Sequence, residues 1–194
     1  MSHFFAMLSR MKYITRWGLM NNTKSENISE HSLQVAMFAH LLVLLHNKET
    51  GENLNAERAA MLGLYHDTTE IITGDMPTPV KYYNPDIIAS YKKVEKIAGE
   101  KLVSMLPEDL RGDYRDLILG ENPDDKDLLV YVKAADKLSA LVKCIEEIRM
   151  GNDEFRQAKE STEKSIHKMN VPEAERFMTE FLPSFSLTLD EQNT

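Results

Sequence analysis

Gly63-Leu64-Tyr65-His66-Asp67-Thr68-Thr69-Glu70 is the stretch where an apolar helical run ends in residues that can bind a metal or move protons. The run that precedes His66 is apolar enough to be buried on most of its surface. Burying an imidazole and a carboxylate there costs free energy unless each finds a partner, and a divalent cation is one such partner. The other interpretation is a helix end with His66 near the negative end of the dipole and Asp67 in solvent.

The composition predicts a single all-α domain. A chain of 194 residues is long enough for one substantial core, and 42% apolar with 28% charged residues is a globular balance. The low counts of 8 Gly and 7 Pro argue against disorder and against a β architecture with many turns. We expect one domain over residues 1–194, with a short, polar and loose tail at 186–194.

Charge and hydropathy exclude several classes of partner. The net charge of −8 would repel a nucleic-acid backbone, so we expect no nucleic-acid polymer as partner. The longest apolar run is interrupted by His40 and His46, and the N-terminus lacks the layout of a signal peptide, so we expect no membrane partner. The single cysteine, Cys144, cannot form an internal disulfide. These features predict a soluble, cytoplasmic protein.

Capping signals place two histidines at helix ends. Ser29 is the predicted N-cap of a long apolar helix, so that His31 falls in its first turn. Asn55 is the predicted N-cap of the helix that delivers His66. Beyond that helix, two prolines and a glycine within residues 73–79 predict an irregular loop. A constrained loop beside a candidate site is suited to form one wall of a ligand pocket.

A further candidate ligand lies on a long helix predicted from Pro123 to about Met150. Asp136 comes one turn after Val132 and two turns after Leu129, so its carboxylate shares their buried stripe. A buried aspartate paired with a lysine or a backbone group is the alternative interpretation. Two imidazoles and two carboxylates form the donor set of a borderline transition metal and leave positions for water and substrate.

The order His31, then His66-Asp67, then a distant Asp136 resembles the HD superfamily of metal-dependent phosphohydrolases. His40 and His46 lie outside that order and are interpreted as packed or solvated. A closer resemblance, to the bacterial 5′-deoxynucleotidases of the YfbR-like family, spans nearly the whole chain. It is carried by residues 2–5 (SHFF), 27–36 (NISEHSLQVA), 65–67 (YHD), 74–81 (GDMPTPVK) and 183–185 (PSF).

This resemblance implies an HD-type helical bundle and a homodimeric enzyme. The implied reaction is hydrolysis of deoxyribonucleoside 5′-monophosphates to deoxyribonucleosides and phosphate, with selection against ribonucleotides. One divalent cation per chain is implied, with cobalt, manganese or copper favoured. The implied metal ligands are His31, His66, Asp67 and Asp136.

The same resemblance implies roles for further residues. Glu70, Arg16 and Asp67 are the implied catalytic residues, and the implied substrate contacts are Arg16, Trp17, Asp67, Asp75, Met76, Pro77 and Thr78. The residue types suit these roles. Arg16 offers a planar donor fork that matches phosphate oxygens. Glu70, three residues after Asp67, lies on the same side of the helix if the helix continues, where it could shuttle protons.

Two alternatives stay open. An HD phosphohydrolase acting on a cyclic dinucleotide, an alarmone or a nucleoside triphosphate would keep the chemistry and change the substrate. Those ligands need more positive charge than Arg16, Lys24 and Lys81 offer. In a non-catalytic helical binding protein, the histidines and aspartates would be structural, and the metal content of the purified protein would distinguish that class.

Overall fold

The computed structural model describes residues 1–81 and 83–193, and this part of the chain is a bundle of helices joined by short connections. Its α-helices are α1 Phe4–Leu8, α2 Ile28–Thr50, α3 Ala56–Tyr65, α4 Glu70–Thr73, α5 Thr78–Lys81, α6 Pro85–Ser104, α7 Arg111–Leu119, α8 Lys126–Arg149, α9 Arg156–Met169, α10 Pro172–Glu180 and α11 Leu189–Gln192. Short 3₁₀ helices are η1 Ser9–Tyr13, η2 Glu108–Leu110, η3 Pro123–Asp125, η4 Asp153–Phe155 and η5 Leu182–Ser186. Within the described residues, β pairing is limited to one bridge between Thr15 and Asn27. The predicted all-α class is confirmed.

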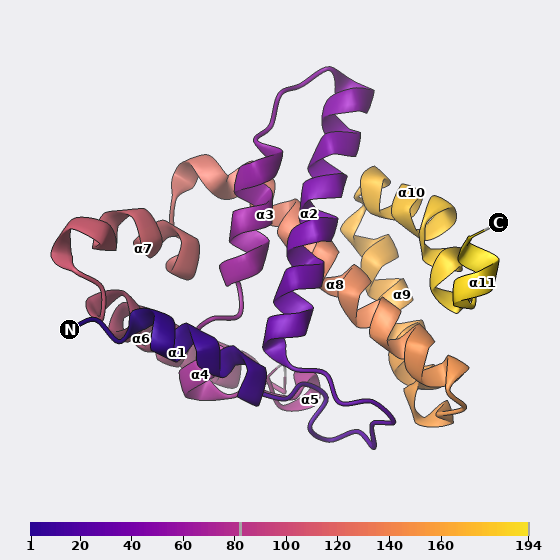
Figure 1. The fold of residues 1–194 in the computed structure, drawn as a ribbon, viewed down its shortest axis with the longest axis horizontal. Coiled ribbons are helices and arrows are strands. Elements are labelled where there is room, and N and C mark those ends of the chain that lie inside the picture. The colour runs from indigo at the N-terminus through magenta and orange to yellow at the C-terminus, as the bar shows by residue number, and fades with distance from the viewer. Residues whose placement is uncertain (82, 194) are drawn as a thin grey trace.

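The centre of the bundle is formed by α2, α3 and α8. Figure 1 shows α2 and α3 side by side, with α8 packed against both. The fully buried side chains of Leu42, Ala59 and Leu138 bring these three helices into one core. By length and composition alone α2 could also span a membrane, yet half of its most apolar window is buried inside the protein. His40 and His46 interrupt the apolar run, but the mean hydropathy of the helix is still as high as that of a membrane-spanning segment.

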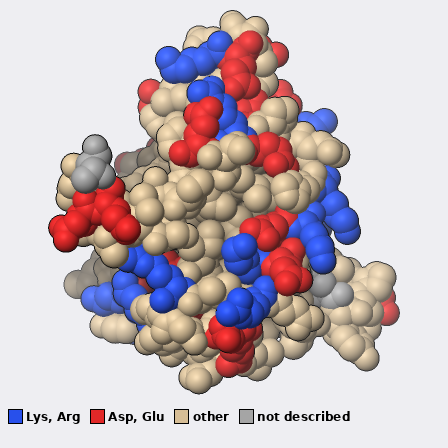
Figure 2. Space-filling model, turned by 90° about the vertical axis from the view of Figure 1, so that its right-hand side faces the viewer, with Lys and Arg blue, Asp and Glu red and all other residues tan. Residues whose placement is uncertain are grey.

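Two outer groups of helices flank this centre on opposite sides (Figure 1). On one side, Phe4 of α1 packs with Leu102 of α6 and Ile118 of α7 in a smaller core. On the other side, Ile166 of α9 and Phe177 of α10 extend the main core. Figure 2 shows acidic and basic side chains interspersed on one face, without a continuous basic stripe.

A glycine sets the distance between α2 and α3. A Cβ atom at Gly63 would lie 3.0 Å from Ala36 Cα and 3.1 Å from Ala36 N. Such contacts are shorter than ordinary van der Waals separations, so a larger residue would push the helices apart. Because α3 can approach the backbone of α2 this closely, the helix ends that carry His31 and His66 come together.

The helix starts are set by asparagines. Asn27, not the predicted Ser29, caps α2: its Oδ1 accepts hydrogen bonds from the backbone N–H of Ser29 at 3.0 Å and of Glu30 at 3.1 Å. The Glu30 carboxylate accepts in return from the Asn27 N–H at 3.3 Å, which completes a capping box. Asn55 caps α3 as predicted, accepting from Arg58 N at 2.8 Å.

The C-terminal region that was predicted to be a loose tail contains the short helix α11. Thr188 caps it in a capping box with Glu191. Gln192 Nε2 donates to the Ser184 carbonyl oxygen at 2.9 Å, which ties α11 to η5. Residue 194 of the predicted tail lies outside the described residues.

Candidate active site

His31 lies near the N-terminal end of α2 and is almost completely buried, with 1% of its surface exposed. Its Nδ1 lies 2.9 Å from Ser139 Oγ on α8. Ser139 Oγ donates its own proton to Gln34 Oε1 at 2.7 Å, so it accepts from His31. The proton of the neutral ring is therefore on Nδ1, and the lone pair is on Nε2. Burial, and then the charge of Arg16, lower the pKa of His31, which favours the neutral form that binds metals.

His66 is fixed in the same tautomer by a different partner. It directly follows α3, and its Nδ1 lies 2.7 Å from the Gly63 carbonyl oxygen. Because a carbonyl oxygen only accepts, Nδ1 of His66 carries the proton and Nε2 presents a lone pair when the ring is neutral. The centroids of the His31 and His66 rings are 5.2 Å apart. Both rings thus have one nitrogen fixed by the protein and the other free for a ligand.

The two predicted aspartates lie beside these free nitrogens. Asp67 Oδ2 is 3.1 Å from His66 Nε2 and 3.5 Å from His31 Nε2. Asp136 Oδ1, from α8, is 3.2 Å from His31 Nε2. Two ligand atoms bound to one cation at about 2.1 Å and at right angles to each other lie about 3.0 Å apart. The separations in this cluster are close to that value.

The polar atoms of this cluster fit a divalent cation. Among the described residues, His31 Nε2 and His66 Nε2 belong to the few buried side-chain atoms without a hydrogen-bond partner. One ligand atom each from His31, His66 and Asp67 lie within 4.8 Å of one another. Burial opposes the ionised form of Asp67, but His66 and then His31 lower its pKa to about 2. A cation at this position would give both nitrogens the partner that they lack.

Glu70 lies close to this cluster in sequence but not on a continuous helix. α3 ends at Tyr65, residues 66–69 form turns, and Glu70 begins α4. Its backbone N–H still donates to the Asp67 carbonyl oxygen at 3.0 Å, so one turn links the two residues. The side chain is buried, and its Oε2 has no hydrogen-bond partner. Burial, and then the charges of Asp67 and Asp75, raise the pKa of Glu70 to about 9.

Arg16 and Trp17 lie on the loop between η1 and α2. Backbone hydrogen bonds tie its two ends: Arg16 N donates to Glu26 O at 2.9 Å, next to the bridge between Thr15 and Asn27. Arg16 NH2 is 3.9 Å from Asp136 Oδ1, which places the guanidinium beside the cluster. Trp17 adopts a φ of 61°, a left-handed conformation that bulky residues rarely hold. Such strain persists only where the surroundings fix it, and it is common at ligand sites.

Asp75 of the predicted substrate loop responds to Arg16 and Trp17. Burial raises the pKa of Asp75, and the charge of Arg16 and then the backbone N–H of Trp17 act in the opposite direction. Met76 and Pro77 are partly buried, and Thr78 is exposed at the start of α5. Their substrate contacts stay predictions.

Three residues that support the cluster were not predicted as site residues. Glu26 Oε2 accepts from Arg16 NH1 at 2.6 Å and from Trp17 Nε1 at 3.0 Å, so one oxygen holds both side chains. Gln34 and Ser139 hold His31, as described above. Ser139 offered a signal, because it is a polar residue on the same buried stripe as Asp136. Glu26 offered none, because it lies in a polar loop without periodicity.

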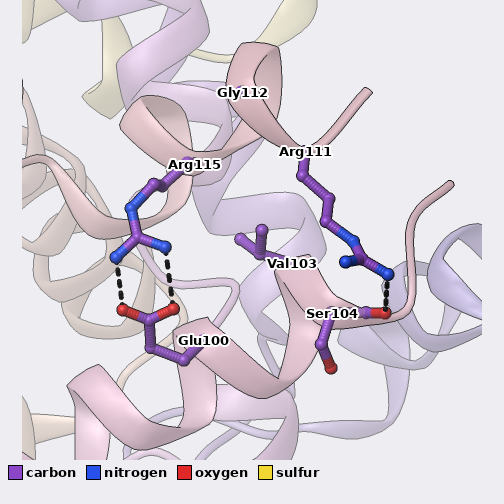
Figure 3. Close-up of a pocket in the computed structure, with 6 residues that line it drawn as sticks. All are labelled: Glu100, Val103, Ser104, Arg111, Gly112 and Arg115. Carbon is purple, nitrogen blue, oxygen red and sulfur yellow. Dashed lines mark hydrogen bonds and ion pairs between the residues drawn. The ribbon is translucent and has the colours of Figure 1, made fainter. Parts of the chain in front are cut away.

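A surface pocket of about 260 Å³ between α6 and α7 lies apart from this cluster. Figure 3 shows that its two arginines are already engaged. Arg115 forms a two-pronged ion pair with Glu100 at 2.8 and 2.5 Å. Arg111 donates to the Ser104 carbonyl oxygen at 3.3 Å and to that of Leu106 at 3.1 Å. This pocket has no free cationic group for a phosphate among the residues drawn.

The helical fold is that of solved HD-domain phosphohydrolases. An HD-domain phosphohydrolase from Listeria innocua superposes with a TM-score of 0.79 at 23% identity, over 99% of this chain and 92% of the other. The HD phosphohydrolase of cyanophage S-2L, solved with dA and one catalytic Zn²⁺ ion, gives a TM-score of 0.65 at 18% identity, over 94% and 96%. At these identities, the likeness concerns the fold.

The sequence comparisons are more specific. A family model described as 5′-deoxynucleotidase YfbR-like matches residues 3–185. Curated 5′-deoxynucleotidases from Yersinia pestis (strain Pestoides F) and Yersinia pseudotuberculosis (serotype O:3, strain YPIII) are each 54% identical over 191 residues, which is 98% of this chain and 96% of theirs. The chain belongs to the YfbR-like family.

Proposed function

We infer that this protein is a metal-dependent 5′-deoxynucleotidase, a phosphomonoester hydrolase that converts deoxyribonucleoside 5′-monophosphates to deoxyribonucleosides and phosphate. The reaction class is supported by membership of the family and by the names of the curated relatives. The observation that carries the metal dependence is the pair of buried Nε2 atoms on His31 and His66, both without a partner and both within 3.5 Å of the Asp67 carboxylate.

His31, His66, Asp67 and Asp136 would hold the cation in this proposal. When bound, a divalent cation activates water as a nucleophile and offsets negative charge on the phosphoryl oxygens. A mixed imidazole and carboxylate donor set suits borderline transition metals, and we propose cobalt, manganese or copper. Metal content and activity measured with each metal in turn test this choice.

Arg16 and Glu70 supply the remaining chemistry. The Arg16 guanidinium is held beside Asp136 with donors left over after its bond to Glu26, and these would orient the phosphate. Glu70 is a buried carboxyl group with a free oxygen and a raised pKa, properties that suit a group that holds and moves a proton. Hydrolysis breaks the bond between phosphorus and O5′, adds the oxygen of water to phosphorus and leaves a proton on O5′.

We propose that Trp17 selects deoxyribose. A ribose 2′-hydroxyl against the indole would shed water without gaining a partner, which costs about 1–3 kcal/mol. An apolar wall therefore gives only about 10²-fold selection, and stronger selection needs a steric clash or displacement of Trp17. Trp17→Ala should admit ribonucleoside monophosphates and weaken binding of deoxy substrates, whereas Arg16→Ala should lower activity on both sugars alike.

The decisive experiment is phosphate release from a nucleotide panel with added metals. The panel contains matched deoxy and ribo monophosphates, triphosphates, an alarmone and a cyclic dinucleotide. Release from deoxy monophosphates alone, lost on chelation and restored by metal, supports the proposal. Preferential turnover of another nucleotide, or full activity in chelator, would contradict it. An unchanged sugar preference in Trp17→Ala would remove Trp17 from its role.

We also propose a homodimer in the cytoplasm. α2 exposes Leu33, Met37 and Leu44 at helical spacing, and the adjacent α3 exposes Met61 and Leu64, which together suit a self-complementary apolar interface. The location in the cytoplasm rests on the single, buried Cys144. Light scattering of Met37→Lys against the parent tests the dimer, because a charge at a self-complementary interface is repeated on both copies and should produce monomers.

A further inference from the structure

The loop that carries Arg16 and Trp17 is also held between its two ends, at residues 23 and 24, by a polar cluster away from the proposed metal ligands. We call this cluster the loop clamp and define it as Lys143 and Glu147 on α8 with Asn152 just after α8. Lys143 follows Asp136 by seven residues, which is about 10 Å along the helix axis. None of the three residues has a part in the chemistry described above.

The loop clamp binds the backbone of the loop. Glu147 Oε2 accepts from the Thr23 N–H at 2.8 Å and from Asn152 Nδ2 at 2.8 Å. Glu147 Oε1 accepts from the Lys24 N–H at 3.0 Å and from Lys143 Nζ, which also donates to the Lys24 carbonyl oxygen. A single ion pair thus forms hydrogen bonds with two successive N–H groups and one carbonyl oxygen of the loop.

Positioning of the loop explains this ion pair better than a contribution to the stability of the fold does. Glu147 is completely buried and Lys143 is 4% exposed, and a buried ion pair usually stabilises a fold no more than apolar side chains of similar size. Apolar side chains could not bind the polar backbone of the loop. Burial opposes ionisation of Glu147, but the hydrogen bonds from Lys143, Asn152 and the loop backbone lower its pKa to about 2. The Glu147 carboxylate therefore stays ionised near neutral pH.

A stack of side chains links the loop clamp to Trp17. Lys143 Nζ lies 5.5 Å from the centre of the Phe155 ring, and that ring is fully buried. The Phe155 and Trp17 ring centres are 5.3 Å apart. The indole also donates from its Nε1 to Glu26 Oε2 at 3.0 Å. Phe155 and Glu26 therefore both hold the indole of Trp17, whose backbone has the strained φ of 61°.

We propose that Lys143 and Glu147 are positioning residues for sugar selectivity: by clamping residues 23 and 24 and supporting Phe155, they hold the Trp17 indole against the deoxyribose. This inference rests on the proposed function, in which Trp17 faces the sugar. It assigns a role in specificity to an ion pair that touches neither the substrate nor the metal ligands.

The test replaces the pair by apolar side chains in the double variant Lys143→Met, Glu147→Leu. Trp17 is the only tryptophan of the protein, so tryptophan emission reports on this one side chain. We expect emission shifted to longer wavelength, stronger quenching by acrylamide and an unchanged metal content. The preference for deoxy over ribo substrates, as a ratio of kcat/KM, should fall about tenfold, within the roughly 10²-fold that an apolar wall can provide. The loss should appear mainly as a higher KM for the deoxy substrate.

The matched control is Arg58→Met, Asp125→Leu. This variant also removes an ion pair with a buried carboxylate, which is held by bonds of 2.9 and 2.6 Å. The ion pair that it removes joins the start of α3 to η3 and lies outside the loop clamp. We expect it to keep the emission, the quenching and the sugar preference of the parent. If the control changed all three as much as the test variant does, the effect would be general loosening and the proposal would be overturned.

A milder variant covers the case in which the double variant does not fold. Asn152→Ala removes the bonds that its side chain donates to Glu147 and to the Asn21 carbonyl oxygen, together with the bond at 3.3 Å that it accepts from the Glu154 N–H. The ion pair itself stays in place, so we expect the same changes at smaller size. Folded variants with the emission and sugar preference of the parent would overturn the proposal. A parent that released no phosphate from any deoxynucleotide would overturn the proposed function instead, and the emission and quenching data would still decide whether the clamp positions Trp17.

Discussion

The helix α2 carries a histidine near each end, and the two are bonded in opposite ways. At the C-terminal end, both ring nitrogens of His46 have carboxylate partners: Nδ1 lies 2.8 Å from Glu173 Oε1, and Nε2 lies 3.2 Å from Glu52 Oε2. At the N-terminal end, His31 is bonded through Nδ1 to Ser139, and its buried Nε2 forms no hydrogen bond, although Asp136 Oδ1 lies 3.2 Å away. Both ring nitrogens of His46 are hydrogen-bonded within the protein, whereas only one ring nitrogen of His31 is.

This difference separates a structural histidine from a candidate metal ligand. A buried nitrogen without a partner costs free energy, and a protein keeps such an atom where something else binds it. His46 needs no ligand, in line with its position outside the sequence pattern of the HD superfamily. Counting the partners of each nitrogen therefore distinguishes two histidines that share one apolar helix.

The largest expected effect comes from removing each histidine in turn. His31→Ala should lose the bound metal and lower phosphate release by at least about 10²-fold, because one of four ligands is missing. His46→Ala, the matched control from the same helix, should keep metal and turnover and lose only stability. Elemental analysis and kinetics on both variants measure this. Asp136→Ala should behave like His31→Ala, and stoichiometric metal in either of them would show that the proposed ligand set is wrong.

The next effect separates metal binding from proton transfer. Glu70→Gln keeps the size and buried position of the side chain but cannot exchange a proton near neutral pH. We expect full metal content with turnover lowered by about 10²–10⁴-fold, the usual scale for a positioned acid or base. Loss of metal in this variant would make Glu70 a ligand, and retained turnover would move the proton transfer to another group.

A smaller effect is expected from the partner that orients His31. Ser139→Ala removes the acceptor of the Nδ1 proton, so the tautomer that presents Nε2 is no longer fixed. Metal affinity should fall by about 10–100-fold, as is usual for the outer partners of metal ligands, and added metal should restore much of the activity. Competition with a chelator measures the affinity. The control is Ser32→Ala, at a second fully buried serine, which lies on α2, and it should leave the metal affinity unchanged.

The smallest effect concerns His46, the histidine with two carboxylate partners, and it depends on pH. Burial opposes the charged form of His46, but the hydrogen bonds to Glu173 and Glu52 outweigh it and raise the pKa. The charged form of His46 therefore stabilises the folded protein. This contribution is fully present below the unfolded-state pKa of about 6.5 and is lost as pH rises through the higher folded-state pKa. The difference in unfolding free energy between the parent and His46→Gln should be larger at acidic than at alkaline pH. Equal differences at both would show that the charge contributes nothing.

The sequence predicted the parts of the site that follow from helix periodicity. Asp136 was placed by its spacing from Val132, and the structure brings its carboxylate to 3.2 Å from His31 Nε2. The start of α2 was predicted two residues too late, because Ser29 and Asn27 are both good N-caps. The hydrogen bonds that Asn27 accepts from Ser29 N and Glu30 N, with the return bond from the Asn27 N–H to Glu30, decide between them.

The loop between η1 and α2 was not predictable in the same way. Its conformation depends on Glu147 and Lys143, more than a hundred residues away in sequence, and neither residue carries a local signal of that contact. Glu26, which joins Arg16 to Trp17, was missed for the same reason. Periodicity reports which face of a helix is buried, but it does not report which distant side chain fixes an irregular loop.

Gly63 has a consequence for engineering this enzyme. Replacing a helical glycine by alanine is a common stabilising step, worth up to about 1 kcal/mol when the site has room. Here the added methyl group would meet Ala36 at 3.0 Å, and the same glycine presents the carbonyl oxygen that fixes His66. A thermostability programme guided by helix propensity alone would choose this position and separate the two histidines, trading catalytic performance for a more regular helix.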